Sequence, residues 1–243
     1  MRRFSPIVLL AVVVVFTGSG RDEKQSGQGE KVNILTAQEK KEGWKLLFDG
    51  KTTNGWRAVS SEEFPHFRWK VKEGELEIIP PKDRNSKVRS DIITVEQYGN
   101  FELKLEFKIR EDLGRKANSG IKYFVQPGTR IGFEYQILSE QPRSKGRSAL
   151  ADLYVLVRAT GGVTRPAGEW NEVRIVVNGS HGEHWLNGRK VLEYKRRTPE
   201  LRALIAKSKY GDFENFGEFT KGHILLQDHG GGVVFRNIKI KEF

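Results

Sequence analysis

Polar, titratable side chains lie near the C-terminus in the segment Gln227-Asp228-His229-Gly230-Gly231-Gly232, between a β-like run that precedes it and another that follows. At a strand turn, a rigid sheet holds such side chains where solvent still reaches them. Imidazole titrates near neutral pH, and the three glycines leave clearance for a ligand. His229 is therefore a candidate general acid or base, whereas we expect structural roles for His66, His181 and His184.

A second polar pair lies in the run Phe133-Glu134-Tyr135-Gln136-Ile137-Leu138. Strand alternation directs the aromatic and aliphatic residues to one face, and directs Glu134 and Gln136 to the other. A carboxylate can accept a proton or bind a metal, and an amide can hydrogen-bond sugar hydroxyls. The alternative is an ordinary solvated strand face.

The segment Asn118-Ser119-Gly120 precedes an apolar run that begins at Ile121. Its spacing favours a turn. If the strand that follows pairs with the Glu134 strand, Lys122 would face the same way as Glu134. These residues would then form a polar cluster on one sheet face.

Strand patterns dominate the rest of the chain. Between 101 and 110, apolar residues alternate with charged ones, a period of two that buries one face of a sheet and exposes the other. Asn187-Gly188 separates two further runs and is typical of a two-residue hairpin. Strands at this short spacing predict an all-β fold, an antiparallel β-sandwich or jelly roll.

Only two short helices are expected. Thr36-Ala37-Gln38-Glu39 has capping-box spacing, and Gly43 would end that helix. Thr198 followed by Pro199 predicts a second helix, packed through Leu201, Leu204 and Ile205. We expect the aromatic rings of Trp170 and Trp185 to pack in the core.

The N-terminus resembles a secretory signal, with Arg2 and Arg3 before an apolar run from Ile7 to Phe16. We expect a signal peptide at 1–20, a flexible linker at 21–34 and one domain at 35–243, secreted or periplasmic. The apolar run is too short to span a bilayer. The chain has no cysteine, which excludes disulfides and thiolate metal ligands.

The net charge of +11 comes from basic residues scattered among acidic ones. No nucleic-acid motif accompanies them, so nucleic acid is not an expected partner.

Six ordered blocks between Gly43 and Phe243 resemble the 3-keto-disaccharide hydrolase domain family. They are Gly43 to Lys51 with Gly55-Trp56, Asn118 to Ile121, Glu134 to Leu138, Gly168 to Asn171, His184 to Gly188, and Leu226 to Gly230 with Phe235 to Ile238. The resemblance implies a concanavalin A-like sandwich that hydrolyses glycosides whose C3 hydroxyl has been oxidised to a ketone. It also implies an oxidised carbohydrate substrate, made by a sugar 3-oxidoreductase.

A C3 ketone acidifies the proton on C2, so that a base can remove it and the C1 aglycone can leave; water then adds. This chemistry needs a base, an acid and a group that stabilises the enediolate. With the resemblance, Glu134 and His229 are the candidate base and acid, in either order. Asn118, Lys122 and Gln136 would bind sugar oxygens or the enediolate, and Asp228 would orient His229 or share a divalent metal ion with it.

The chain departs from the family pattern at two points. Relatives often have Leu-Tyr-Asp-Leu where this chain has Leu153-Tyr154-Val155-Leu156, and an Asp-Asp and a His where Ser139-Glu140-Gln141-Pro142 stands. Two alternatives therefore stay open. One is a carbohydrate-binding module that stacks sugars on tryptophans. The other, a retaining glycosidase, would require Glu134 and Glu140 about 5 Å apart, far closer than a regular strand allows.

Overall fold

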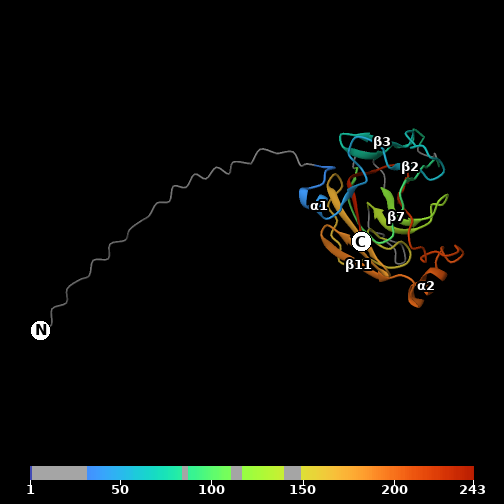
Figure 1. The fold of residues 1–243 in the computed structure, drawn as a ribbon. Coiled ribbons are helices and arrows are strands. Elements are labelled where there is room, and N and C mark those ends of the chain that lie inside the picture. Colours follow the sequence, from blue (N-terminus) through green and yellow to red (C-terminus); the bar gives the residue numbers. More distant parts are fainter. Residues whose placement is uncertain (2–31, 84–86, 111–116, 140–148) are drawn as a thin grey trace. The chain divides into compact units, whose positions relative to one another are not determined.

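Two antiparallel sheets form a β-sandwich, which confirms the predicted fold class (Figure 1). The structure, a computed structural model, describes residues 1, 32–83, 87–110, 117–139 and 149–243. The larger sheet has eight strands: β1 (Lys45–Leu46), β3 (Trp69–Lys72), β4 (Glu75–Ile78), β6 (Phe101–Ile109), β9 (Trp170–Asn178), β10 (His181–Leu186), β11 (Arg189–Lys195) and β13 (Val233–Glu242). The smaller has five: β2 (Trp56–Ala58), β5 (Ile92–Thr94), β7 (Asn118–Val125), β8 (Phe133–Leu138) and β12 (His223–Leu226).

The core lies between the two sheets and follows from the alternation along their strands. In β6 the residues Leu103, Leu105 and Phe107 are buried, while the charged residues between them face outward. In the smaller sheet the order is β2-β5-β12-β7-β8, so β7 and β8 form one edge. Asn187 and Gly188 both have positive φ between β10 and β11, as the predicted two-residue hairpin requires.

One strand begins earlier than predicted. Asn118, Ser119 and Gly120 belong to β7 and pair with β8, so the predicted turn is wrong. The apolar alternation begins only at Ile121, which is why the local pattern suggested a turn. Asn118 and Gly120 therefore lie on the same face of β7 as Lys122.

The helices begin at the predicted caps. α1 (Ala37–Lys41) has a complete capping box on Thr36 and is followed by Gly43 at φ 84°. α2 (Pro199–Ala206) is capped by Thr198 and buries Leu201 and Ile205, but Leu204 is 44% exposed, contrary to the prediction. Neither described helix combines the length and apolarity that crossing a membrane requires.

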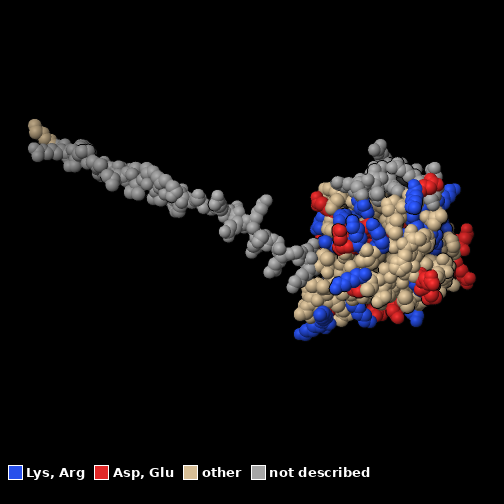
Figure 2. All heavy atoms as spheres, turned by 90° about the horizontal axis from the view of Figure 1, so that it is seen from above, with Lys and Arg blue, Asp and Glu red and all other residues tan. Residues whose placement is uncertain are grey.

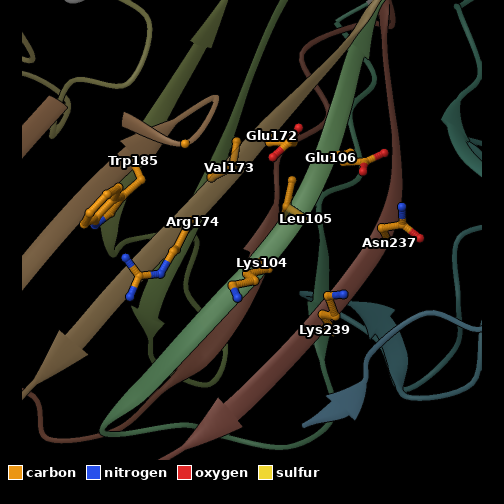
Figure 3. Close-up of a pocket in the computed structure, with 10 residues that line it drawn as sticks. Lys104, Leu105, Glu106, Glu172, Val173, Arg174, Trp185, Asn237 and Lys239 are labelled. Atoms are coloured by element: carbon orange, nitrogen blue, oxygen red, sulfur yellow. The ribbon is translucent and has the colours of Figure 1, made fainter. Parts of the chain in front are cut away.

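The outer face of the eight-stranded sheet carries two tryptophans that were expected in the core. Trp170 and Trp185 are only half-buried, and cations cover their rings. The Arg236 guanidinium lies 4.2 Å from the centre of the Trp170 ring, and that of Arg174 lies 4.6 Å from the Trp185 ring. Figure 3 shows Trp185 and Arg174 beside a pocket of about 310 Å³ on this face.

Basic and acidic side chains are interspersed over the surface that Figure 2 shows. Many of them pair across strands, such as Arg174 with Glu102 at 2.6 Å. On this face, the positive charge does not gather into a single patch.

A buried hydrogen-bond chain joins the two sheets. His184 of β10 is fully buried, and its Nδ1 must donate to the Ala151 carbonyl, at 2.8 Å. A neutral imidazole then accepts at Nε2, so the Tyr123 hydroxyl of β7 donates to it at 2.9 Å. The Tyr123 oxygen in turn accepts from the Tyr194 hydroxyl of β11, at 2.7 Å. His184 therefore has the structural role expected for it.

This chain of hydrogen bonds requires a neutral imidazole, and burial lowers the pKa of His184 from 6.5 to about 4. The unfolded chain binds a proton at His184 below pH 6.5, whereas the folded chain resists it until about pH 4. Stability is therefore lost as pH falls through this window, by about 3 kcal/mol at most.

We predict that His184→Gln removes this part of the acid sensitivity, even if it costs stability at pH 7. Urea unfolding at pH 7 and pH 4 measures the free energy of unfolding in both proteins. The control is His66→Gln, which replaces an exposed histidine that takes no part in this chain of hydrogen bonds. Parallel pH profiles for wild type and His184→Gln would contradict the assignment.

Candidate active site

Two rows of side chains cross the outer face of the five-stranded sheet. Cross-strand partners share a face, and the register pairs Lys122 of β7 with Glu134 of β8, and Gly120 with Gln136. On the other side of β7, Leu225 of β12 is the partner of Lys122. The intervening residues of β8 lie in the core: Phe133, Tyr135 and Ile137. The edge of the sheet thus presents a carboxylate, an ammonium and an amide together.

Glu134 is a buried carboxyl with a cation beside it. It is 4% exposed, and Lys122 Nζ lies 3.5 Å from its Oε2. Lys122 also donates a hydrogen bond of 3.1 Å to the carbonyl of Arg130. Burial raises the pKa of Glu134 above 4.5, while the charges of Lys122 and Lys209 oppose that rise. A carboxylate with a raised pKa is a stronger proton acceptor than an exposed one.

The side chain of Glu134 lies over Gly120, so a larger residue there would displace it. A Cβ on Gly120 would stand 2.6 Å from Oε1 of Glu134 and 3.0 Å from its carboxyl carbon. Gly120 does not have positive φ, so its backbone conformation does not demand glycine. The missing side chain is what makes room for the carboxylate.

Gln136 and Asn118, both predicted to bind substrate, contact each other. Gln136 Nε2 donates to Asn118 Oδ1 at 3.0 Å, and also lies within hydrogen-bond distance of the carbonyls of Ser119 and Ile137. Gln136 is 2% exposed and Asn118 is half-buried. The amide nitrogen of Gln136 is therefore occupied by hydrogen bonds within the protein. The Gln136 oxygen and the more exposed Asn118 side chain are the groups that can bind a ligand.

Three residues that the sequence did not single out lie beside Glu134. The backbone N–H of Tyr154 donates to the Glu134 carbonyl at 2.9 Å. Lys209 Nζ lies 4.3 Å from the centre of the Tyr154 ring and 5.0 Å from that of Tyr210. Burial and the nearby charge of Glu134 raise the pKa of Tyr210. Lys209 and Tyr210 are far from Glu134 in the sequence, so no local pattern could reveal them.

One departure from the family pattern falls in this region. Val155 follows Tyr154, is 44% exposed and has a φ of 58°. A β-branched residue rarely adopts this left-handed conformation, whereas aspartate tolerates it well. This backbone conformation would suit the aspartate that the family resemblance leads us to expect here, although the side chain of Val155 is apolar. At the second departure, residues 140–142 lie outside the described part of the chain.

A second buried carboxylate, Asp91, flanks the cluster and was also missed. Its Oδ2 is 3.0 Å from Arg130 Nε, and its Oδ1 accepts from the backbone N–H of Asp228 at 2.8 Å. Burial raises the pKa of Asp91, with Arg130 and Lys122 opposing the rise. One feature of the sequence pointed to it: Asp91 directly precedes the apolar strand β5 and, by strand alternation, faces the same side as Ile93.

Asp228 makes a structural ion pair rather than the contacts proposed from the sequence. Arg68 donates to both of its oxygens, at 2.7 and 2.8 Å, and the backbone N–H groups of Ser90 and Gly230 donate to them at 2.9 Å. Asp228 is 2% exposed and Arg68 is 3% exposed. Four donors satisfy the carboxylate, so it has little capacity left to orient His229 or to bind a metal ion.

His229 is exposed on the turn that follows β12. The N–H of Gln227 donates to the Gly120 carbonyl at 2.9 Å, which brings the start of this turn alongside the strand beneath Glu134. Within the described residues, no hydrogen bond or ion pair joins His229 to Glu134. Glu134 therefore lies on β8 and His229 on the turn after β12, with β7 between those two strands.

The described residues of the candidate site do not supply three grouped ligands for the divalent metal ion that the sequence left open. Among the described residues, one group of three has metal-ligand geometry, His181, Glu183 and Glu193, on the β10–β11 hairpin. Lys190 Nζ pairs with both carboxylates of that group, at 3.2 and 2.5 Å. Neither Glu134 nor His229 belongs to it.

We predict that Gly120→Ala destabilises the protein by about 1–3 kcal/mol because its methyl group collides with the Glu134 carboxylate. The same substitution made in a Glu134→Ala background should be nearly neutral, because the collision partner is gone. Chemical unfolding of the four proteins in this double-mutant cycle gives the coupling free energy. Equal costs in both backgrounds would show that Glu134 does not lie over Gly120.

Comparison with known proteins supports one family. The family model described as the 3-keto-alpha-glucoside-1,2-lyase-like domain matches residues 43–241. A curated relative, the 3-keto-disaccharide hydrolase of Bacteroides thetaiotaomicron, is 31% identical over 232 residues, which cover 82% of this chain and 78% of the relative.

Two solved structures from Parabacteroides distasonis, each provisionally described as a glycosyl hydrolase, are also similar. The first is 31% identical with a TM-score of 0.75, and the match covers 88% of this chain and all of that one. The second is 27% identical with a TM-score of 0.57, over 78% of this chain and all of that one. The extent of the family match, together with the shared sandwich, leads to one conclusion: the chain belongs to the 3-keto-alpha-glucoside-1,2-lyase-like domain family.

Proposed function

We propose that the protein hydrolyses 3-keto-glycosides, with Glu134 as the base that removes the C2 proton. The observation that carries the proposal is the buried Glu134 carboxyl paired with Lys122 on the outer face of the smaller sheet. The family and the name of the curated relative support the substrate class. A carboxyl that burial makes more basic, and that a lysine helps to keep ionised, suits proton abstraction next to a ketone.

In this mechanism, Glu134 takes the C2 proton and the C2–H electrons form the enediolate of the C3 ketone. The Lys122 ammonium stabilises the developing oxyanion. The C1–oxygen bond then breaks, and an acid protonates the departing oxygen; exposed His229 is the candidate. Water adds across the double bond, its oxygen at C1 and a proton at C2, so the net reaction is hydrolysis. An oxidoreductase that acts on the C3 hydroxyl must supply the substrate.

The decisive experiment follows aglycone release from a 3-keto-α-glucoside and from its unoxidised parent, each with and without a chelator. We expect release from the keto sugar alone, and no effect of the chelator. Equal release from both sugars would instead indicate an ordinary glycosidase. Binding of either sugar without release would favour a carbohydrate-binding module.

Glu134→Gln should lower kcat/KM for the keto sugar by at least roughly a hundredfold, because an amide cannot accept the proton. The matched control is Glu96→Gln, which changes an exposed carboxyl in the same way. Steady-state kinetics measures both, and thermal unfolding checks that each variant is folded. If the two variants retain similar activity, Glu134 is not the base.

Lys122→Met should move the acid limb of the pH profile of kcat/KM to higher pH. The base must be ionised to act, and the Lys122 charge lowers the pKa of Glu134, so its removal leaves the carboxyl protonated over a wider range. Lys209→Met should shift the limb in the same direction but less, because Lys209 is exposed. An acid limb that stays in place in both variants would mean that another group controls it.

A further inference from the structure

An apolar pocket lies where the β7–β8 loop meets the segment after α2. Its volume is about 430 Å³, within the range of small-molecule sites. Six of its thirteen lining residues are aromatic or aliphatic: Phe124, Ile131, Phe133, Phe213, Phe216 and Phe219.

The wall of this pocket is fixed, but its rim is open. Phe124, Phe133 and Phe216 are all at least nine-tenths buried. The Phe216 ring stacks on Tyr210, with centres 4.2 Å apart and planes 8° from parallel, and meets Phe133 edge-on at 5.2 Å. Phe213, by contrast, is 45% exposed. The pocket therefore offers a preformed aromatic surface that solvent can reach.

The pocket adjoins the candidate active site through two residues. Arg130 lines it, pairs with Asp91, and accepts through its carbonyl the hydrogen bond of Lys122, the partner of Glu134. Tyr210, stacked on the pocket's Phe216, is close enough to Glu134 for the carboxylate charge to raise its pKa. Arg130 therefore borders both the pocket and the pair that Lys122 makes with Glu134.

Four polar side chains line the pocket: the charged Arg130 and Glu214, which are exposed, and Gln126 and Thr129, which already hydrogen-bond to the backbone. Gln126 Nε2 already donates to the carbonyls of Phe124 and Lys221, and Thr129 Oγ1 donates to the Gln126 carbonyl. Sugar hydroxyls buried against phenylalanines would lose water without gaining comparable hydrogen bonds. An aromatic ring would bury its surface there without that cost.

We propose that this pocket binds the aglycone, and that the preferred substrates are 3-keto-glucosides with an aromatic aglycone rather than a second sugar. The inference rests on the proposed function for the reaction itself. It goes further by assigning the leaving group to a defined set of side chains that includes Phe213.

The test compares 4-nitrophenyl 3-keto-α-glucoside with a 3-keto-disaccharide, in wild type, Phe213→Ala and Leu204→Ala. Leu204 is also exposed, at 44%, lies on α2 and does not line the pocket, so it is a matched control. Phe213→Ala should raise KM for the aryl substrate roughly tenfold, the equivalent of about 1.4 kcal/mol. Its kcat should change little, because the contact exists before and during the reaction. KM for the disaccharide should stay within twofold in both variants.

Equal effects of Phe213→Ala on both substrates, or no effect on the aryl substrate, would overturn the inference. A direct binding measurement separates it from the proposed reaction. Unoxidised 4-nitrophenyl α-glucoside, titrated by calorimetry, should bind wild type and Leu204→Ala more tightly than Phe213→Ala. If wild type cleaves neither keto sugar, the proposed function fails, and this titration alone then supports or rejects the aromatic site.

Discussion

The hydrogen-bond chain through His184 is the interaction on which the sandwich and its candidate active site both depend. It joins β10 and β11 of the larger sheet to β7 of the smaller one, and it ends at the carbonyl of Ala151. Ala151 belongs to the segment whose Tyr154 pairs with the backbone of Glu134. Each member needs the next to satisfy a buried polar group, so the chain fixes one arrangement of the sheets. Gly182 contributes by leaving space that the Tyr194 ring fills.

The site obeys the same rule that a buried polar group needs both room and a partner. Gly120 supplies the room for Glu134, and Lys122, two residues along the same strand, supplies the charge. Neither alone would suffice: without the glycine the carboxylate has no place, and without the lysine its burial would favour the neutral acid. Gly120 and Lys122 are two residues apart, so both lie on the face of β7 that the Glu134 side chain of β8 covers.

Much of the fold was accessible from local patterns. The alternation in β6, the Asn187-Gly188 turn and the caps at Thr36 and Thr198 each act through neighbours in the sequence. The pairing of Lys122 with Glu134 needed only the assumption that their strands are adjacent. Lys209 and Tyr210 could not be found this way, because long-range packing alone brings them to the site. The same holds for Trp170 and Trp185, whose covering cations come from other strands.

The segment Gln227-Asp228-His229 shows why neighbouring residues in a motif need not share one chemical task. The Asp228 carboxylate is buried against Arg68, and through Ser90 and Gly230 it holds the turn against the chain that leads into β5. His229 next to it is exposed. A carboxylate buried with four donors is stable because its hydrogen bonds are satisfied, and the same satisfaction makes it a poor metal ligand. The motif therefore combines an anchor with an accessible imidazole, and the rigidity of the first is what gives the second a defined position.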